Sequence, residues 1–558
     1  MKLTGAEILI ESLIEQGVTD VFGYPGGQVI NIYDALYKYQ DKINHVLTAH
    51  EQGASHAADG YSRATGKVGV CIATSGPGAT NLVTGIATAM LDSIPMVAIT
   101  GNVPCSLIGK DSFQEIDITG VTLPITKHNY FVHKIEDLAD IVEEAFSIAK
   151  SGRPGPVLID IPKDVQVATY EHTPHALAPK IPLPKVAETG IEQAVALIKE
   201  AKRPYIYIGG GAAGLGMGKE IIAFAEKIDA VVGCSFMGLS AVQSDARFLG
   251  MQGMHGHYAS SMAQNEADLI LAVGVRFSDR ATGNVKKFAR NSKIIQLDPD
   301  FAEVNKNVRV DLGLVGDVAD SFSRIAEKCE KAVHPEWASR INELKAQEGE
   351  NEKAIALQSE GVLTPKKIIE AVNATKPTGT VITTDVGQHQ MWTAQYAQFD
   401  RPRRFVSSGG LGTMGFGLGA AMGAYVATKD PTVLITGDGS FGMNLNELAT
   451  AVTYNLPIVI VLMNNGVLGM VRQWQTLFFG KRYSNTVLER KTDFVALAKA
   501  FGANGVKVNT EEELISALNT AWKANGPTVI DVTVEKDEFV LPMLPPGGAI
   551  DDMITKVK

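Results

Sequence analysis

The chain has 558 residues, 45% of them hydrophobic and 20% charged, which are the proportions of an ordinary globular protein. That length exceeds what one hydrophobic core organises and predicts about three or four domains.

The net charge of −10 and the lack of basic runs argue against a nucleic-acid partner. No apolar stretch reaches the ~20 residues of a membrane span and no secretory or transit signature is present, so we expect a cytoplasmic protein without a membrane partner. The four cysteines are widely spaced and predict free thiols rather than a metal site.

The first segment alternates short apolar strands with helical stretches, the pattern of a parallel sheet. Thr4 and Glu7 are spaced as a capping box and predict a helix at the start of the chain. Expected strands lie at residues 46–48, 68–73, 95–100 and 157–161. We therefore predict a first domain over residues 1–165.

Four prolines between residues 174 and 184 mark an extended linker to the second segment. A second domain is predicted over residues 188–340, with strands at 205–208, 269–273 and 294–297. A charged stretch at 343–360 is expected to be a helical or exposed connector. The third domain, over residues 362–535, has expected strands at 381–384, 433–436, 458–463 and 529–534, and a tail follows over 536–558. The predicted fold class is α/β, with three doubly wound parallel-sheet domains.

Two polar motifs end neighbouring apolar runs in the third segment. Gly437-Asp438-Gly439 follows one run, and Asn464-Asn465 follows the next after 24 intervening residues, enough for one helix and one strand. A crossover helix between parallel strands brings their carboxyl ends together, where open α/β sheets bind ligands. One carboxylate and one amide suit Mg²⁺ holding a diphosphate, because this ion takes its other ligands from phosphate and water. The spacing resembles the thiamine diphosphate binding motif; a plain βαβ unit is the alternative.

The second half of such a site is expected far away in the sequence. The strand at 46–48 leads through His50 and Glu51 into a helix of small residues over 53–64. A glutamate at such a junction is often only a cap or a solvated residue. In thiamine diphosphate enzymes, however, the glutamate in this place hydrogen-bonds the aminopyrimidine N1′ of the cofactor and shares its proton.

The resemblance covers nearly the whole chain. Matching motifs are Phe22-Gly23-Tyr24-Pro25-Gly26-Gly27, Thr74-Ser75-Gly76-Pro77-Gly78-Ala79-Thr80-Asn81, Phe113-Gln114-Glu115, Thr126-Lys127-His128-Asn129 and Ser408-Gly409-Gly410-Leu411-Gly412-Thr413-Met414-Gly415. Together they resemble the catalytic large subunits of the acetohydroxyacid (acetolactate) synthases. This family joins two 2-oxoacids in branched-chain amino acid biosynthesis. Its pyrimidine-binding, FAD-associated and diphosphate-binding domains correspond in order to the three segments.

The resemblance implies a thiamine diphosphate and Mg²⁺ site in the third domain. The metal ligands would be the side chains of Asp438 and Asn465 and the backbone carbonyl of Val467. The other residues expected around the cofactor are Val386, Gly387, Gln388, His389, Gly412, Met414, Gly437 and Gly439. Met414 matches the residue that props the cofactor into its bent conformation, although a methionine between glycines can also be generic gap-filling. His389 can equally be a structural histidine.

The second 2-oxoacid needs a cation for its carboxylate. Arg280 matches the family's arginine for that task, and its planar fork suits a carboxylate better than a lysine would. Sequence alone favours an ion pair with the adjacent Asp279. Trp474 resembles the residue that favours 2-oxobutyrate by contacting its extra methyl group, a contact worth about 1–3 kcal/mol. Phe113, Gln114 and Lys163 map to the access channel and the reacting face.

A flavin is the least intuitive expectation. Residues 209–214 follow a strand and fit GxGxxG, but no acidic residue stands where the dinucleotide fingerprint wants one, and a tight turn explains the glycines as well. The resemblance places FAD near Arg153, Gly211, Met254, His255, Arg276, Asp298 and Asp317. The reaction has no net oxidation, so FAD would be mainly structural.

Three departures and several alternatives accompany this interpretation. Ser278 replaces a common Asp near the flavin, Val467 a common His, and Gly442 a larger residue. Catabolic acetolactate synthases lack FAD, and the motif at 253–256 with the loop at 276–280 favours the biosynthetic type. The alternatives that remain are another thiamine diphosphate carboligase or decarboxylase, a flavoprotein of the pyruvate oxidase type and a non-catalytic scaffold.

Assembly is also implied by the resemblance. The family places the cofactor between the pyrimidine domain of one subunit and the diphosphate domain of another. We therefore expect a homodimer or homotetramer. A small regulatory subunit is a further expected partner, because the biosynthetic synthases that this chain resembles bind one.

Overall fold

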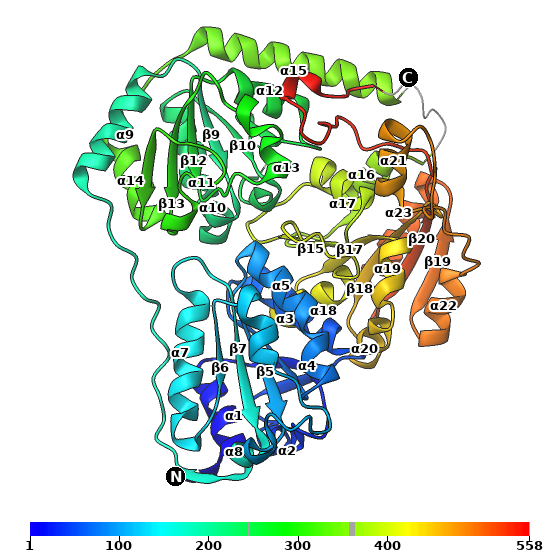
Figure 1. The fold of residues 1–558 in the computed structure, drawn as a ribbon. Helices are drawn as coiled ribbons and strands as arrows, with labels where there is room; N and C mark the ends of the chain where they lie inside the picture. The colour runs from blue at the N-terminus through cyan, green and yellow to red at the C-terminus, as the bar shows by residue number, and fades with distance from the viewer. Residues whose placement is uncertain (244, 357–362, 557–558) are drawn as a thin grey trace.

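Within residues 1–243, 245–356 and 363–556, the computed structural model contains three six-stranded sheets whose strands pair in parallel. Helices cover each sheet, and the three sheets follow one another along the chain (Figure 1). The predicted fold class is confirmed. None of the helices in these ranges has the length and apolar character that crossing a bilayer requires.

The N-terminal sheet has the strand order β3-β2-β4-β5-β7-β6. Its strands are β2 (Asp20–Tyr24), β3 (Asn44–Leu47), β4 (Gly69–Ala73), β5 (Met96–Asn102), β6 (His128–Phe131) and β7 (Pro156–Pro162). Its helices are α1 (Gly5–Glu15), α2 (Ile30–Lys38), α3 (Glu51–Thr65), α4 (Pro77–Asn81), α5 (Val83–Asp92), α6 (Ile118–Thr122), α7 (Leu138–Lys150) and α8 (Lys163–Val167). The expected capping box of Thr4 and Glu7 starts α1.

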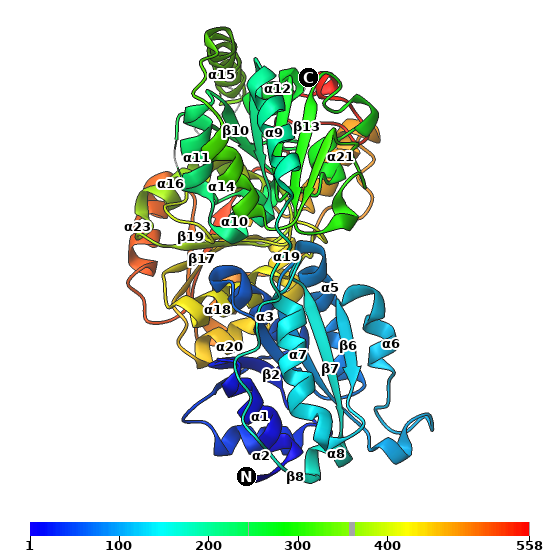
Figure 2. The same cartoon turned by 90° about the vertical axis from the view of Figure 1, so that its left-hand side faces the viewer.

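The central sheet has the order β11-β10-β9-β12-β13-β14. Its strands are β9 (Pro204–Ile208), β10 (Val231–Cys234), β11 (Phe248–Met251), β12 (Leu269–Val273), β13 (Lys293–Asp298) and β14 (Leu312–Val315). Its helices are α9 (Glu188–Glu200), α10 (Gly210–Leu215), α11 (Gly218–Lys227), α12 (Tyr258–Glu266), α13 (Asp279–Thr282) and α14 (Val318–Lys328). Between the first two domains runs an extended linker, which follows the left side of Figure 1 and faces the viewer in Figure 2. It begins with β8 (Thr169–Glu171), which pairs antiparallel to β1 (Lys2–Thr4).

The C-terminal sheet has the order β16-β15-β17-β18-β20-β19. Its strands are β15 (Val381–Thr384), β16 (Phe405–Val406), β17 (Thr432–Gly437), β18 (Ile458–Asn464), β19 (Asn504–Val508) and β20 (Thr528–Thr533). Its helices are α16 (Pro365–Thr375), α17 (Gln388–Tyr396), α18 (Gly417–Thr428), α19 (Asp438–Asn444), α20 (Glu447–Thr453), α21 (Gly469–Phe478), α22 (Phe494–Phe501) and α23 (Glu511–Ala521). The stretch between the two polar motifs thus holds two helices, α19 and α20, where one was predicted.

The N- and C-terminal domains share a core through α3 and α18, which lie side by side in both ribbon views. A Cβ at Gly60 would overlap the carbonyl of Ala420, and one at Gly423 would overlap the carbonyl of Ala57. Only glycine allows backbones to approach this closely. The shared cluster also includes Ala54, and it joins the two domains into one packed body.

The stretch predicted as a charged connector forms the long helix α15 (Pro335–Ala356). Three parts of the predictions lie outside the described residues: the end of the connector at 357–360, the domain boundary at 362 and the end of the tail at 557–558. Glu348 of α15 accepts hydrogen bonds from the Ala259 backbone N–H at 2.6 Å and pairs with His257 Nδ1 at 2.9 Å. The long helix is thereby clamped to the start of α12. Burial lowers the pKa of His257, but the Glu348 carboxylate outweighs burial and leaves the pKa above its ordinary value.

This clamp predicts a pH-dependent contribution to stability. Because the pKa of His257 is raised in the folded state, its contribution is complete below the unfolded value of about 6.5 and is lost as pH rises through the folded value. We expect His257→Gln to lower the thermal unfolding midpoint more at about pH 6 than at about pH 8.5. The exposed His133→Gln is the control, and an equal loss at both pH values would contradict the assignment.

Candidate active site

The two polar motifs of the C-terminal domain meet at one edge of its sheet. β17 and β18 pair so that Gly437 lies opposite Met463, which places Asp438 at the start of α19 beside Asn465. Burial raises the pKa of the Asp438 carboxyl to about 6, and backbone N–H groups, including that of Asn465, act in the opposite direction. A carboxylate, an amide and the carbonyl of Val467 are hard oxygen donors of the kind Mg²⁺ takes. The described residues hold no cluster of three or more His, Cys, Asp or Glu side chains fit for another metal.

The loop after β15 packs against these motifs through Gln388. Its Oε1 accepts from Asn465 Nδ2 at 3.4 Å, and its Nε2 donates to Gln473 Oε1 at 3.0 Å and to the Glu538 carbonyl at 2.8 Å. The Asn465 amide is therefore oriented by a side chain that also holds α21 and the segment after β20.

His389 lies buried beside Gly437, where an added Cβ would come within 2.9 Å of the imidazole Nδ1. Burial lowers the pKa of His389 to about 3, so the ring is neutral at pH 7. Its Nε2 has no hydrogen-bond partner among the described residues. A neutral, buried histidine with a free ring nitrogen can accept or donate one hydrogen bond to a ligand but is no ordinary acid or base.

Gly412 and Met414 lie over the same edge on the loop at 407–416. Gly412 has φ +69°, a conformation that favours glycine, and its nearest neighbour is Val386. The Met414 Cε is 4.0 Å from the Cβ position of Gly439. Met414 is half-buried, so this side chain borders the diphosphate motif without being absorbed into the core.

A second group of predicted residues gathers in the N-terminal domain. Glu51 is the first residue of α3 and accepts from Asn81 Nδ2 at 2.9 Å. Gln114 has φ +61° and lies directly against Gly76, where a Cβ would come within 2.9 Å of its carbonyl oxygen. Lys163 starts α8, and its Nζ is 3.4 Å from the Gly27 carbonyl.

Phe113, next to Gln114, is 84% exposed. Across residues 1–243, 245–356 and 363–556, no hydrogen bond or ion pair joins Glu51 or Gln114 to Asp438 or Asn465. The predicted residues of the N-terminal domain and those of the C-terminal domain therefore form two groups with no direct polar contact between Glu51 or Gln114 and Asp438 or Asn465 in the described part of the chain.

A third group lies where the central domain meets α21. The Arg280 guanidinium lies over the Trp474 ring, with Cζ 5.8 Å from its centroid, and Arg280 Nη1 is 3.7 Å from Met254 Sδ. The alternative ion pair with Asp279 is long, at 3.9 Å, and both side chains are exposed. Trp474 Nε1 is buried with no partner in the described part of the chain. The structure thus brings the two residues predicted to face the second substrate into contact.

The residues expected near a flavin divide into two kinds. Arg153 pairs with Glu303 at 2.6 Å, whereas the half-buried Arg276 makes no ion pair with any described residue. Burial and then Arg153 lower the pKa of Arg276, and burial raises the pKa of Asp298 to about 6. An unpaired guanidinium beside a second arginine fits an anionic group such as a phosphate.

The remaining flavin candidates have structural contacts of their own. Asp317 caps α14 by accepting from the Asp320 N–H at 3.0 Å. Gly211 packs against Gly274, where a Cβ would come within 2.8 Å of the Gly274 Cα, so close backbone packing accounts for that glycine. The His255 carbonyl accepts a hydrogen bond from Gln395 Nε2 at 2.9 Å, while the buried His255 Nδ1 has no partner among the described residues.

Comparison with known proteins agrees with this arrangement. Three domain models match in order: the N-terminal TPP binding domain of thiamine pyrophosphate enzymes over residues 3–121, their central domain over 191–325, and their C-terminal TPP binding domain over 385–532. The chain is 44% identical to the acetolactate synthase isozyme 2 large subunit of Escherichia coli strain K12, with 100% of both chains covered. It is 45% identical to the acetolactate synthase large subunit of Corynebacterium glutamicum, covering 99% of this chain and 90% of that protein.

The chain belongs to the acetolactate synthase large-subunit family. Its N- and C-terminal matches are both TPP binding domains, which supports thiamine diphosphate as its cofactor. Two of the three residues that depart from the family pattern, Gly442 and Val467, have local contacts that the structure shows. Gly442 leaves room for Arg490, whose Nη1 would lie 2.8 Å from a Cβ there, and Val467 is buried with its N–H donating to Asn465 Oδ1 at 3.1 Å. Ser278 is exposed at the start of α13.

Sequence reasoning missed Glu447, a residue of this acetolactate synthase homologue that positions the Glu51 backbone. The fully buried carboxylate of Glu447, on α20, accepts from the backbone N–H groups of Ala49 at 3.1 Å and His50 at 3.0 Å. Burial raises the pKa of Glu447, and these bonds act in the opposite direction. A lone glutamate in a helix gives no sequence signal for a contact with residues 398 positions away.

We expect Glu447→Gln to destabilise this contact. The amide has one acceptor oxygen, so one of the two N–H groups would face an NH₂ donor. Leaving a buried donor unsatisfied costs about 1–3 kcal/mol of unfolding free energy. The thermal midpoint should fall, whereas the exposed Glu226→Gln should leave it unchanged. An unchanged midpoint in Glu447→Gln would show that the carboxylate does not hold this junction.

Proposed function

We propose that the chain is the catalytic large subunit of a biosynthetic acetolactate synthase. It would convert two pyruvates into 2-acetolactate and CO₂, and pyruvate with 2-oxobutyrate into 2-aceto-2-hydroxybutyrate and CO₂. The observation that carries this proposal is the meeting of Asp438 and Asn465 at adjoining strand ends, in a chain that matches acetolactate synthase large subunits over its full length.

Thiamine diphosphate would supply the electron sink for decarboxylation and the carbon nucleophile for ligation. Asp438, Asn465 and the Val467 carbonyl would hold Mg²⁺, and Gln388 would orient the Asn465 amide as ligand. The neutral His389 would offer its free Nε2 to the cofactor. Met414, beside Gly439, would support the cofactor from the other side.

Glu51 would hydrogen-bond N1′ of the aminopyrimidine and share its proton. Arg280 would bind the carboxylate of the second 2-oxoacid, since its guanidinium is exposed on one side and rests on Trp474 on the other. Trp474 would contact the extra methyl of 2-oxobutyrate. Gln114 and Lys163 would line the approach to this site.

FAD is proposed as a structural cofactor. The unpaired Arg276 next to Arg153, and the free Nδ1 of the buried His255, support a phosphate-bearing ligand between the domains. Exposed Ser278 offers no carboxylate there, which is consistent with weaker flavin retention. The two alternatives are a catabolic synthase without FAD and a flavoenzyme of the pyruvate oxidase type.

The partners proposed are further copies of the chain and a small subunit. Glu51 and Asp438 would belong to two different sites, each completed by a second copy of the chain, as the resemblance to the family implies. The relatives are named large subunits, which supports a small regulatory subunit as a further partner. The assignments of 1–165, 188–340 and 362–535 to pyrimidine-binding, flavin-associated and diphosphate-binding roles are part of the same proposal.

Acetolactate formation by the purified protein tests the proposed function. Pyruvate, alone and mixed with 2-oxobutyrate, would be supplied with thiamine diphosphate and Mg²⁺, with FAD present or stripped. We expect acetolactate, dependence on FAD, and activity confined to oligomeric gel-filtration fractions. Activity indifferent to FAD would assign the catabolic type, oxygen consumption would assign the oxidase type, and an active monomer would contradict the shared site.

Glu51→Gln tests the proton-sharing role. The variant should bind thiamine diphosphate as the wild type does, yet form acetolactate about a hundredfold or more slowly, because an amide cannot share the proton. Glu7→Gln, the same change at the start of another helix, is the control and should keep full activity. Turnover by Glu51→Gln within about threefold of wild type would remove Glu51 from this role.

A further inference from the structure

The loop at 407–416, which carries Gly412 and Met414, is held at both ends by one side chain from another domain. Arg63, in the last turn of α3, donates from Nη1 to the Ser407 carbonyl at 2.7 Å. Its guanidinium also lies over the Phe416 ring, with Cζ 5.3 Å from the centroid. The Arg63 side chain is 3% exposed, so it is committed to these contacts.

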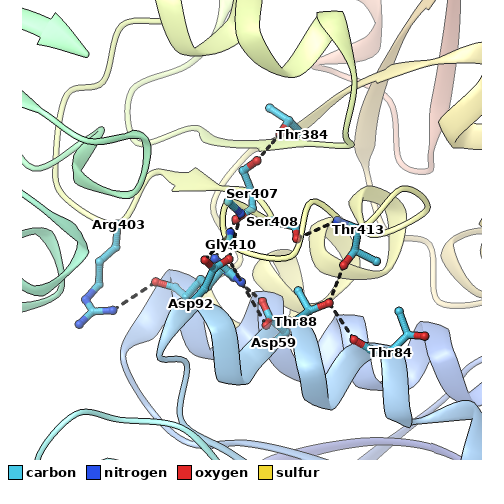
Figure 3. Close-up of polar contacts among 12 residues, drawn as sticks. Asp59, Thr84, Thr88, Asp92, Thr384, Arg403, Ser407, Ser408, Gly410 and Thr413 are labelled. Carbon is cyan, nitrogen blue, oxygen red and sulfur yellow. Dashed lines mark hydrogen bonds and ion pairs between the residues drawn. The ribbon is translucent and has the colours of Figure 1, made fainter. Parts of the chain in front are cut away.

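Asp92, the last residue of α5, accepts hydrogen bonds from the same loop near its middle (Figure 3). Its carboxylate accepts from the backbone N–H groups of Gly409 at 2.9 Å and Gly410 at 2.7 Å. A third contact of the Asp92 carboxylate is with Arg63 Nη2 at 2.9 Å. A Cβ at Gly410 would come within 2.8 Å of Asp92 Oδ1, so a glycine is required for this approach.

The Asp92 carboxylate depends on the loop for two of its hydrogen bonds. Arg63 lies between Asp92 and Asp59, which pairs with its Nε, and the side chains of both aspartates are fully buried. A buried carboxylate is costly unless it is paired and hydrogen-bonded. Asp92 meets this condition through Arg63 and the N–H groups of Gly409 and Gly410, so it would lose two donors if the loop moved away.

Further bonds connect the loop to both neighbouring domains. Thr88 of α5 bonds Thr413 at 2.7 Å between the two Oγ1 atoms, and Figure 3 shows these side chains facing each other. On the C-terminal side, Thr384 Oγ1 is 2.6 Å from Ser407 Oγ. Thr384 ends β15, and residues 385–387 connect it to α17, so this connection and the loop at 407–416 share one anchor. Gly412 and Leu411 remain exposed between the held points.

We propose that Asp92 and Arg63 are positioning residues for the cofactor, holding the loop at 407–416 so that Gly412 and Met414 face the diphosphate motif. The proposal rests on the assignment of Gly412 and Met414 to the thiamine diphosphate site made above. The N-terminal domain would then act on two bound cofactors. Glu51 would touch the cofactor held by the diphosphate half of a second copy, and Asp92 with Arg63 would shape the diphosphate half of their own chain.

The test is the affinity of the full-length protein for thiamine diphosphate with Mg²⁺, measured by calorimetric titration. In Asp92→Asn the amide NH₂ faces a loop N–H and the ion pair with Arg63 is lost. We expect its dissociation constant to rise about tenfold or more, while the rate of acetolactate formation at saturating cofactor stays within about threefold of wild type. A general loss of structure would not separate affinity from rate in this way.

Asp59→Asn is the matched control. It removes the same charge from the same arginine but has no contact with the loop, so cofactor affinity should stay within about threefold of wild type. Thr88→Val keeps the side-chain volume and removes the bond to Thr413. It should raise the dissociation constant by about threefold to tenfold, and it decides the question should Asp92→Asn fail to fold.

Wild-type affinity in both Asp92→Asn and Thr88→Val would overturn the proposal. So would an equal loss in Asp59→Asn and Asp92→Asn, because the effect would then belong to the buried charges and not to the loop. The measured dissociation constants do not depend on whether the protein forms acetolactate. A wild-type protein that binds thiamine diphosphate but makes no acetolactate would refute the proposed reaction while the loop variants still report on positioning.

Discussion

The close approach of α3 to α18 is the contact on which the rest of the site depends. Glycines at positions 60 and 423 let the backbones of two domains touch, and no larger residue fits there. Glu51 and Arg63 lie twelve positions apart on α3, about 18 Å along its axis at 1.5 Å per residue. The helix therefore acts as a rigid spacer, with a carboxylate at one end and a loop-holding guanidinium near the other. Glu447 and Asp92 then fix the two regions in which those ends lie.

Several features of the fold and site could be predicted from the sequence for definite physical reasons. Uncharged, mostly apolar runs bounded by Gly or polar residues predict the strands at 269–273 and 381–384 with the observed limits, because a strand buried on both faces excludes charged side chains. Parallel pairing then required the ends of β17 and β18 to meet. The contact between Arg280 and Trp474 has no such local signal, and the family resemblance predicts only that both residues face the second substrate.

Other features could not be predicted, since they depend on contacts between residues far apart in the sequence. The division of 438–453 into α19 and α20 is such a case. Asp92, Arg63 and Glu447 are single charged residues on helices, where a charge usually means a solvated face. Their burial follows from the packing of domains against one another, and that packing is set by small residues spaced over two distant helices.

The segment after β20 links parts of the molecule that the sheet topology keeps separate. Its Glu538 carbonyl accepts from Gln388, its Leu544 N–H donates to the Met254 carbonyl, and its Gly548 carbonyl accepts from the Asn284 N–H. It thus runs from Gln388, beside Asn465, to the loops beside Arg280. A purification tag fused to the C-terminus, or a truncation made to aid crystallisation, would therefore disturb the contacts that this segment makes with Gln388, Met254 and Asn284.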